Sequence, residues 1–133
     1  MVGVLLGKHG MTYRRASLGK LGEDLAVREL ERRGYAILAR RYRRRGGELD
    51  IVARDGATLV FVEVKTRDGD AFGDGHEAVT ARKQRRMTQT AIDYMMRHRL
   101  TGVPCRFDVV TIRVDEGRPS IEVVPNAFDA TTT

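Results

Sequence analysis

Three charged residues interrupt two apolar segments of the sequence that have the composition of β-strands. Asp50 lies in GELDIVARD, and Glu63 and Lys65 lie in LVFVEVKTR. Burying a charge without a partner is strongly destabilising. We therefore expect these residues either to pair for structure or to carry out chemistry.

The turn between the two segments predicts that the acids lie close together. Residues 55–56 are Asp-Gly, a typical two-residue hairpin turn, and the register counted back from it sets Asp50 opposite Phe61 and Glu48 opposite Glu63. Because side chains alternate between the faces of a strand, these acids share one face. Asp50 and Glu63 become diagonal neighbours, roughly 7–8 Å apart at the backbone, and their carboxylates can converge.

Acids that share a face repel one another, and Lys65 can neutralise only one of them. A divalent cation resolves the conflict, because carboxylate oxygens are hard ligands that suit Mg²⁺ or Mn²⁺. Such an ion makes a water more acidic and stabilises charge on a phosphate, which phosphodiester hydrolysis requires. We therefore expect Asp50 and Glu63 to be metal ligands, and Lys65 to hold the attacking water or a phosphate.

A structural alternative explains part of the same pattern without catalysis. In this interpretation Glu63 and Lys65 form a charge pair at a solvated face of the sheet. The additional acid across the hairpin and the basic character of the chain favour the catalytic interpretation. Asp108, an acid among the apolar residues of RFDVV, is expected to pair with an arginine.

Hydrophobic periodicity predicts the elements that must position these residues. The first helix should follow Ser17, a typical N-cap, and end before Gly34. The expected elements are a helix over residues 18–33, strands over 35–42, 48–54 and 57–66, a second helix from about Thr80 to before Gly102, and strands over 105–114 and 120–124. Their order is α-β-β-β-α-β-β.

The composition of the chain indicates one basic domain. The chain has 133 residues, of which 41% are hydrophobic, and a net charge of +6. This length suits a single domain, expected over residues 17–128, with a flexible basic arm over 1–16 and a disordered tail over 129–133. The positive charge favours an anionic partner, with nucleic acid as the first candidate and a membrane surface as the second.

The cysteine content and the hydropathy of the chain predict a soluble cytoplasmic protein. Cys105 is the single cysteine and cannot form an internal disulfide. The start MVGVLLGKHGM lacks the basic region of a signal peptide. No run approaches the ~18 apolar residues that a membrane-spanning helix needs.

Two arginine-rich segments are candidates for contact with a nucleic-acid backbone. One follows the first predicted strand, and the other opens the second helix, where the helix dipole disfavours cations and so favours an anionic partner. Contacts to phosphate give salt-dependent affinity without sequence preference. In the alternative, both segments are solvated faces of a basic protein. The candidate residues are Arg41, Arg43, Arg44, Arg45, Arg82, Lys83 and Arg86.

Two levels of resemblance support the catalytic interpretation. Asp50, followed after twelve residues by Glu63-Val64-Lys65, resembles the PD-(D/E)xK signature of restriction-endonuclease-like nucleases, with Leu49 in place of the proline. More narrowly, LGEDLAVRELERRGYAILARRYR, GELDIVARD, LVFVEVKTR, RFDVVTI and NAF resemble the YraN-like family of uncharacterised bacterial proteins. The resemblance implies an α/β fold with a restriction-endonuclease-like core of order α-β-β-β-α-β, in which helices flank a mixed central sheet. It also implies Mg²⁺ or Mn²⁺ as cofactor.

An acid on the first helix is a further candidate. The resemblance to Holliday-junction resolvases of the same superfamily implies a metal-binding role for Glu23. Independently, Glu23 precedes Leu30 by seven residues, so the two differ by only ~20° around the helix and Glu23 can face the sheet. In the alternative, Glu23 is a surface acid stabilised by the helix dipole. Lys83 matches the lysine that opens the second helix in the family.

These observations predict a metal-dependent endonuclease that acts on DNA, with branched or junction DNA as one candidate substrate. Its expected catalytic residues are Asp50, Glu63, Lys65 and Glu23, of which the three acids hold the metal. One alternative is a non-catalytic nucleic-acid-binding module of the same fold, and another is a protein whose basic surface binds an acidic partner. Junction resolution requires two symmetric cuts and so implies a homodimer.

Overall fold

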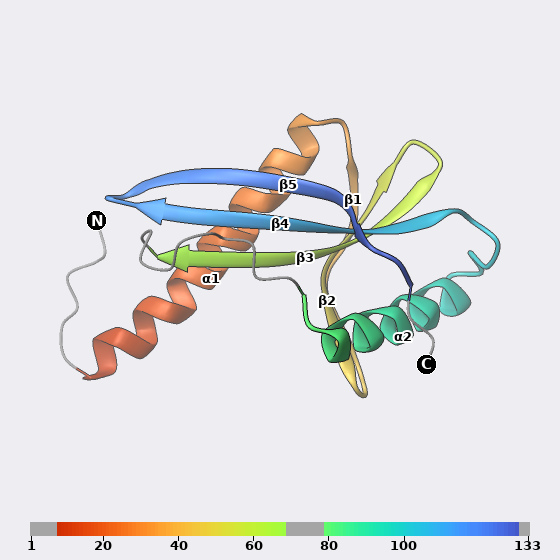
Figure 1. The fold of residues 1–133 in the computed structure, drawn as a ribbon, viewed down its shortest axis with the longest axis horizontal. Coiled ribbons are helices and arrows are strands. Elements are labelled where there is room, and N and C mark those ends of the chain that lie inside the picture. Colours follow the sequence, from red (N-terminus) through yellow and green to blue (C-terminus); the bar gives the residue numbers. More distant parts are fainter. Residues whose placement is uncertain (1–7, 69–78, 131–133) are drawn as a thin grey trace.

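The computed structural model describes residues 8–68 and 79–130. Its elements follow the order expected from the sequence. They are α1 (Lys8–Arg32), β1 (Ala36–Arg44), β2 (Gly47–Asp55), β3 (Thr58–Asp68), α2 (Ala81–Arg97), β4 (Cys105–Asp115) and β5 (Arg118–Phe128). The predicted α/β class is therefore confirmed (Figure 1).

The strands form one mixed sheet with the order β1-β2-β3-β4-β5. Neighbouring strands are antiparallel except for β3 and β4, which are parallel. A parallel pair needs a crossover connection, and α2 lies in it. In Figure 1, β1 and β2 run across the direction of the other strands, which shows a strong twist between the two parts of the sheet.

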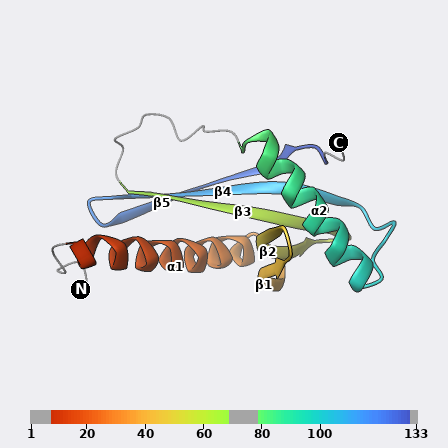
Figure 2. The same cartoon turned by 90° about the horizontal axis from the view of Figure 1, so that it is seen from below.

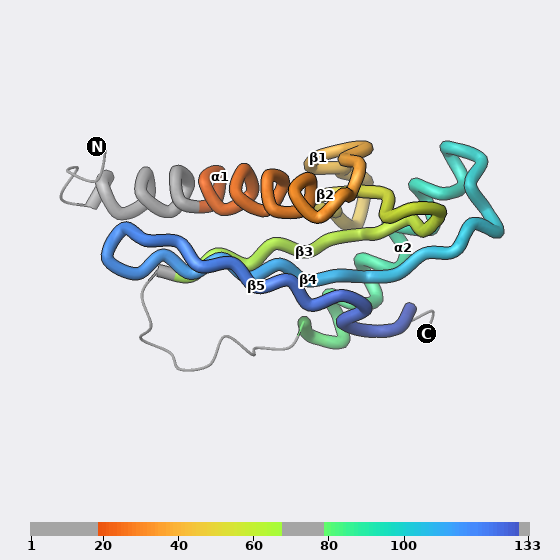
Figure 3. Tube along the Cα trace, turned by 90° about the horizontal axis from the view of Figure 1, so that it is seen from above, coloured from red at the N-terminus to blue at the C-terminus, as the bar shows by residue number. Residues whose placement is uncertain are grey.

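The two helices cover opposite faces of the sheet (Figures 2 and 3). The core on the side of α1 includes Leu30, Val60 and Val62, and the core on the side of α2 includes Phe61 and Tyr94. Both faces of β3 are thus buried, which explains why its sequence is a continuous apolar run rather than an alternating one. This burial also makes any charge within β3 expensive unless it has a partner.

The start of the first helix differs from the prediction. α1 begins at Lys8 instead of residue 18, so residues 8–16 of the predicted arm are helical, while residues 1–7 lie outside the described part of the chain. The first proline of the sequence is Pro104, so no proline interrupts the helix on the N-terminal side of Ser17. A serine alone therefore does not start a helix where the preceding residues can also be helical.

The other helix boundaries agree with the prediction. Gly34, just after α1, has a φ of +94°, a conformation that glycine adopts without strain. Thr80 is the N-cap of α2, and its hydroxyl accepts a hydrogen bond of 3.1 Å from the backbone N–H of Lys83. α2 ends at Arg97, before Gly102 as expected.

The register of the β2–β3 hairpin differs from the prediction by two residues. Asp55 pairs with Thr58, so the turn consists of residues 56–57. Val52 consequently lies opposite Phe61, the position that was predicted for Asp50. An even shift leaves the side chains of the paired residues 51–55 on their predicted faces, because alternation has a period of two residues.

β5 is longer than predicted and contains Pro119 and Pro125. Proline lacks a backbone N–H and is tolerated at the edge of a sheet, where β5 lies. Of the helices in the described ranges, neither has the length and apolar character required to cross a membrane.

Candidate active site

Asp50 and Glu63 form a pair of acids between β2 and β3. The β2–β3 ladder begins at the pair Ile51 and Val62, and Asp50 and Glu63 are the next residues beyond it, close enough for Glu63 to act on the pKa of Asp50. Asp50 Oδ2 accepts a hydrogen bond of 2.8 Å from the backbone N–H of Val64. Glu63 is buried, with 8% of its surface exposed. The sequence predicted the convergence of the two acids, although it predicted a diagonal arrangement.

The electrostatics of the pair are unfavourable without a counter-ion. Burial, and after it the neighbouring Glu63 carboxylate, raise the pKa of Asp50 from its ordinary value of 3.8 to about 7. The hydrogen bond from Val64 and the positive charge of Lys83 act against this rise in pKa. Asp50 thus holds a proton at pH values where an ordinary aspartate is ionised.

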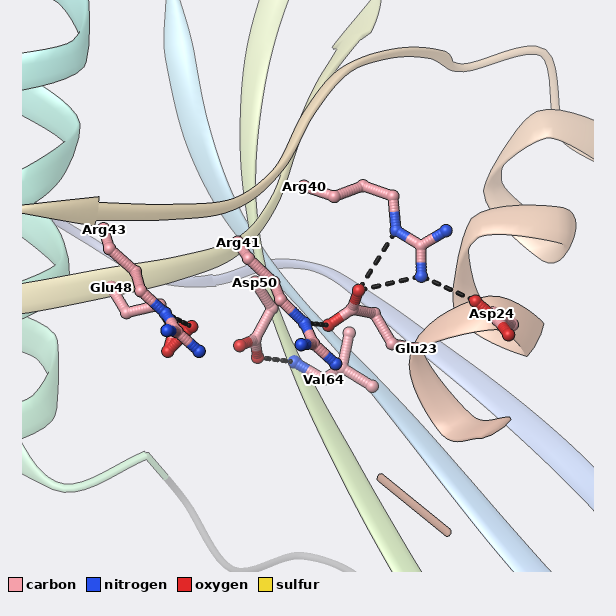
Figure 4. Close-up of polar contacts among 8 residues, drawn as sticks. All are labelled: Glu23, Asp24, Arg40, Arg41, Arg43, Glu48, Asp50 and Val64. Carbon is pink, nitrogen blue, oxygen red and sulfur yellow. Dashed lines mark hydrogen bonds and ion pairs between the residues drawn. The ribbon is translucent and has the colours of Figure 1, made fainter. Parts of the chain in front are cut away.

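A break in the alternation of β2 gives Asp50 its position. Leu49 packs on the side of α2, whereas Ile51, two residues later, packs on the side of α1. The backbone N–H of Val64 binds the side chain of Asp50 instead of a backbone carbonyl of β2. The strand therefore leaves its ladder with β3 at Asp50, where Figure 4 shows the two strands crossing.

Gly47 holds the first residues of β2 against α2. A Cβ atom at this position would lie 2.2 Å from the hydroxyl of Thr90 and 3.3 Å from the carbonyl oxygen of Arg86. Only glycine fits such a close approach between strand and helix. The contact fixes the start of β2 against α2.

A lysine from α2 supplies a positive charge to the acid pair. Lys83 Nζ lies 3.2 Å from Glu63 Oε2. The structural alternative considered for the sequence assigned the ion pair with Glu63 to Lys65 instead. Lys65 is half-buried on β3 opposite Thr111 of β4, and strand alternation places it on the same face as Glu63. Its contact with a water or a phosphate stays a prediction.

Glu23 is buried against the sheet rather than at the surface of α1 (Figure 4). Its Oε1 accepts hydrogen bonds from Arg40 Nε (3.0 Å) and Nη2 (2.8 Å), and its Oε2 accepts one from Arg41 Nε (3.1 Å). Arg40 Nη2 also donates to Asp24 Oδ1 at 2.6 Å. The sequence identified Glu23 as a candidate, but it gave no indication that two arginines of β1 bind its carboxylate.

An open hollow of about 510 Å³ lies between α1 and the start of β2. It contains both acidic and basic side chains, which suits a phosphate bound together with a metal ion. The residues that line it are Gly19, Lys20, Glu23, Arg41, Arg43, Glu48, Asp50, Val64 and Thr66.

A second hollow, of about 310 Å³, lies on the side of α2. Lys83 and Arg86 contribute to its lining together with Glu48, which also lines the first hollow. Basic side chains therefore flank the acid pair on both faces of the sheet. Arg82, also predicted to bind phosphate, is exposed in the first turn of α2.

The arginines at the end of β1 and directly after it are not equivalent. Arg43 Nε binds Glu48 Oε1 at 3.0 Å, and Arg44 Nε binds Asp93 Oδ2 at 3.2 Å. Arg45 is exposed and helps to line a further hollow beside α2. The sequence predicted three equal phosphate-binding residues, whereas the structure pairs the first two with acids.

The donor set fits a cation held by two protein ligands. In the part of the chain that the structure describes, no three His, Cys, Asp or Glu side chains gather as a metal site. Mg²⁺ is commonly bound by one or two carboxylates, with water and phosphate in its other positions. Asp50 and Glu63 meet this requirement, whereas both oxygens of Glu23 already accept hydrogen bonds from arginines.

Asp108, predicted to pair with an arginine, forms a separate buried polar network. It is fully buried, and its Oδ1 accepts hydrogen bonds from Arg106 Nε (3.0 Å) and the Asn126 backbone N–H (2.9 Å). The Tyr35 hydroxyl donates to its Oδ2 at 3.1 Å. The predicted ion pair is confirmed, and the contacts of Tyr35 and Asn126 were not predicted.

The fold and the acid pair together define a class of protein. A mixed sheet flanked by helices, with two acids on adjacent central strands, is compatible with a restriction-endonuclease-like core. Comparison with known proteins then shows the family. The chain belongs to the uncharacterised protein family UPF0102, which matches residues 22–112. This match confirms the predicted resemblance to a family of uncharacterised bacterial proteins.

Individual relatives are similar over almost the whole chain. A UPF0102 protein of Geobacter metallireducens is 49% identical over 119 residues, which cover 90% of this chain and 98% of the relative. A UPF0102 protein of Geobacter sulfurreducens is 50% identical over 89% of this chain and 93% of the relative. A UPF0102 protein of Acidothermus cellulolyticus is 47% identical over 90% of this chain and 98% of the relative.

Proposed function

We propose that this protein is a metal-dependent endonuclease that hydrolyses phosphodiester bonds in DNA. In this proposal Asp50 and Glu63 hold Mg²⁺ or Mn²⁺. The observation that carries it is the pair of buried Glu63 and half-buried Asp50, in which burial and the Glu63 carboxylate raise the pKa of Asp50 to about 7. Paired groups with perturbed pKa values in a hollow are typical of functional sites.

The bound ion would supply an acidified water and stabilise charge on the phosphate. The side chains of the chain would provide the binding and orientation. Lys65, on the same strand face as Glu63, is placed to hold the attacking water or a phosphate oxygen. Lys83 would exchange its contact with Glu63 for a phosphate when the ion neutralises that acid.

The proposal is tested with a panel of linear, flap and four-way-junction DNAs, with RNA for comparison, in Mn²⁺, Mg²⁺ or EDTA. We expect cleavage of DNA with either metal and none with EDTA. Asp50→Asn and Glu63→Gln should abolish the cleavage, while the exposed and unrelated Glu116→Gln serves as a control that retains it. Cleavage that survives EDTA, or that both site variants retain, would overturn the assignment.

Selectivity for junctions makes an additional demand. Two symmetric cuts require a two-fold dimer, whereas a flap nuclease works as a monomer. Light scattering with and without junction DNA should show a dimer if junctions are the preferred substrate. A monomer under both conditions would exclude the junction-selective form of the proposal.

A second candidate function is a nucleic-acid-binding module that does not cleave. The observation that favours it is the pairing of acids with protein cations, because Lys83 lies against Glu63 and two arginines bind Glu23. Such a module would bind the same DNAs equally well in Mn²⁺ and in EDTA and would leave them intact.

A further inference from the structure

Arg41 has an unusual backbone conformation for a residue within a strand. Its φ is +52°, in the left-handed region that residues with a Cβ atom rarely adopt. Such a conformation costs of order 1–3 kcal/mol and is commonly found at functional sites. Glycine would relieve this strain, but it would remove the guanidinium that the conformation directs into the first hollow.

The β1–β2 register places Arg41 next to the acid pair. Arg40 pairs with Ile51 and Tyr42 pairs with Leu49, so the position opposite Arg41 is Asp50. Arg41 and Asp50 line the same hollow, and Figure 4 shows the Arg41 side chain reaching over Asp50 toward Glu23.

Glu23 binds only one edge of the Arg41 guanidinium. The contact is made through Nε at 3.1 Å, and half of the Arg41 side chain is exposed. Among the described residues, none accepts a hydrogen bond from the two terminal NH₂ groups of Arg41. A guanidinium held in this way presents a planar pair of donors, which matches the geometry of phosphate oxygens.

The position of Glu23 is itself fixed by close packing. A Cβ atom at the preceding Gly22 would lie 2.0 Å from the hydroxyl of Thr66, so α1 approaches β3 closely at this point. Arg40 anchors the carboxylate from the other side through Oε1 and also binds Asp24. Glu23 is therefore held firmly enough to orient the arginine that it binds.

The same contacts argue against Glu23 as a metal ligand. To bind a cation, its carboxylate would have to release one or both arginines, and two guanidinium charges would then lie beside the cation. Like charges at this distance repel, most strongly where burial limits screening by water. Asp50 and Glu63 differ in this respect, because Asp50 accepts its hydrogen bond from the uncharged backbone N–H of Val64 and Glu63 lies against a lysine rather than between two guanidinium groups.

We infer that Glu23 is a positioning residue that holds Arg41 for contact with a phosphodiester of the bound DNA beside Asp50 and Glu63, and that it is not a metal ligand. This inference rests on the proposed function for the identity of the ligand. It assigns to Arg41 a specific contact at the site, distinct from the general attraction of the other arginines.

The test measures DNA affinity in EDTA by fluorescence anisotropy, so neither metal nor cleavage is needed. Glu48→Ala is the matched control for Glu23→Ala, because Glu48 lines the same hollow and also pairs with an arginine, Arg43. Because DNA is an anion, loss of a carboxylate by itself should leave the affinity for DNA unchanged or higher, and this is the result expected for Glu48→Ala. Glu23→Ala should instead weaken binding roughly fivefold, about as much as Arg41→Gln.

Two additional variants separate positioning from a general structural effect. The double variant of Glu23→Ala with Arg41→Gln should bind no more weakly than Arg41→Gln alone, because the two residues act through one contact. Glu23→Gln retains an acceptor oxygen and should recover part of the lost affinity. If Glu23→Ala fails to fold in urea melts, Glu23→Gln and its double variant replace it in the same comparison.

Calorimetric titration with Mn²⁺ completes the test. Glu23→Ala should bind Mn²⁺ within about twofold of the parent, whereas Asp50→Asn should lose binding. Two results would overturn the inference. One is a Glu23→Ala variant that binds DNA as tightly as Glu48→Ala, and the other is a Glu23→Ala variant whose affinity for Mn²⁺ falls roughly tenfold or more. If DNA binding depends on Glu23 as expected but no DNA is cleaved, the proposed nuclease activity fails and the inference stands.

Discussion

The fully buried acid Asp108 and the half-buried acid Asp50 are stabilised in very different ways. Asp108 accepts hydrogen bonds from Arg106, Tyr35 and the backbone of Asn126, so its charge and its lone pairs are satisfied within the protein. Asp50 accepts one hydrogen bond from a backbone N–H and lies against a second acid, which raises its pKa. Satisfied polar groups stabilise a fold, whereas unrelieved repulsion is typical of a binding or catalytic site.

The surrounding groups show the same difference. The hydrogen bond to Asp108 raises the pKa of Arg106, and burial raises the pKa of Tyr35, so both remain protonated partners of that acid. At the other site, Lys83 is exposed and binds only one of the two acids. The Asp108 network therefore satisfies its acid within the protein, whereas the proposed function assigns the Asp50 pair to an additional cation.

The largest expected effect distinguishes the two acids by stability. Asp108→Ala should lower the free energy of unfolding by ~3–5 kcal/mol, because it leaves Arg106 without its buried partner. Asp50→Asn should leave stability unchanged or raise it, because it removes a repulsive charge. Urea melts in EDTA provide both values. Equal losses for the two variants would remove the distinction on which the functional assignment depends.

The second prediction concerns pH. Folding raises the pKa of Asp50 from 3.8 to about 7. Between these two pH values the folded protein keeps a proton on Asp50 that the unfolded protein has released. The free energy of unfolding is therefore highest, as far as Asp50 is concerned, below a pH of about 4, and this contribution is lost as the pH rises through about 7. Asp50→Asn should be ~1–3 kcal/mol more stable than the parent near pH 8, with the difference vanishing near pH 4. Parallel stability curves for the two proteins would contradict the raised pKa.

A third, smaller effect tests the backbone strain at Arg41. Both Arg41→Gly and Arg41→Ala remove the guanidinium, but only glycine adopts a φ of +52° without strain. The glycine variant should be more stable than the alanine variant by ~1 kcal/mol in urea melts. As a control, the same two substitutions at Arg43, whose φ is not positive, should favour alanine. If alanine is also better at Arg41, the residue is not strained.

The smallest effect concerns the arginines at the end of β1 and directly after it. Arg43 and Arg44 are paired with acids, whereas Arg45 is exposed. Arg45→Ala should therefore flatten the dependence of DNA affinity on salt by about one phosphate contact, and Arg44→Ala by less. Anisotropy titrations over a range of salt concentrations measure both slopes. Equal slopes for both variants would show that the pairing of Arg44 does not matter for binding.

The sequence predicted the features that depend on local patterns. Alternation predicted that Asp50 and Glu63 converge, and the error of two residues in the register kept the paired side chains of β2 and β3 on their predicted faces because the period of a strand is two. The break in alternation beside Asp50 was not predicted. The glycine after α1 and the Thr80 cap of α2 also followed from local chemistry. These local signals were sufficient to predict the order of elements and the pair of acids.

The sequence could not predict contacts between distant elements. The binding of Arg40 and Arg41 to Glu23 joins β1 to α1 and depends on the close approach at Gly22. The pairing of Glu63 with Lys83 likewise depends on how α2 packs on the sheet. No periodic pattern encodes such contacts, so the sequence identified the charged residues of the site but not which of them are partners.

The most direct test of the central claim is the effect of Mn²⁺ on the stability of the parent protein and of Asp50→Asn. A ligand that binds only the folded state raises the free energy of unfolding, by about 2.7 kcal/mol at one hundred times its dissociation constant. Urea melts with Mn²⁺ and with EDTA should show this stabilisation for the parent and little or none for Asp50→Asn. Equal stabilisation of both proteins, or none of the parent, would contradict the assignment of Asp50 and Glu63 as a metal site.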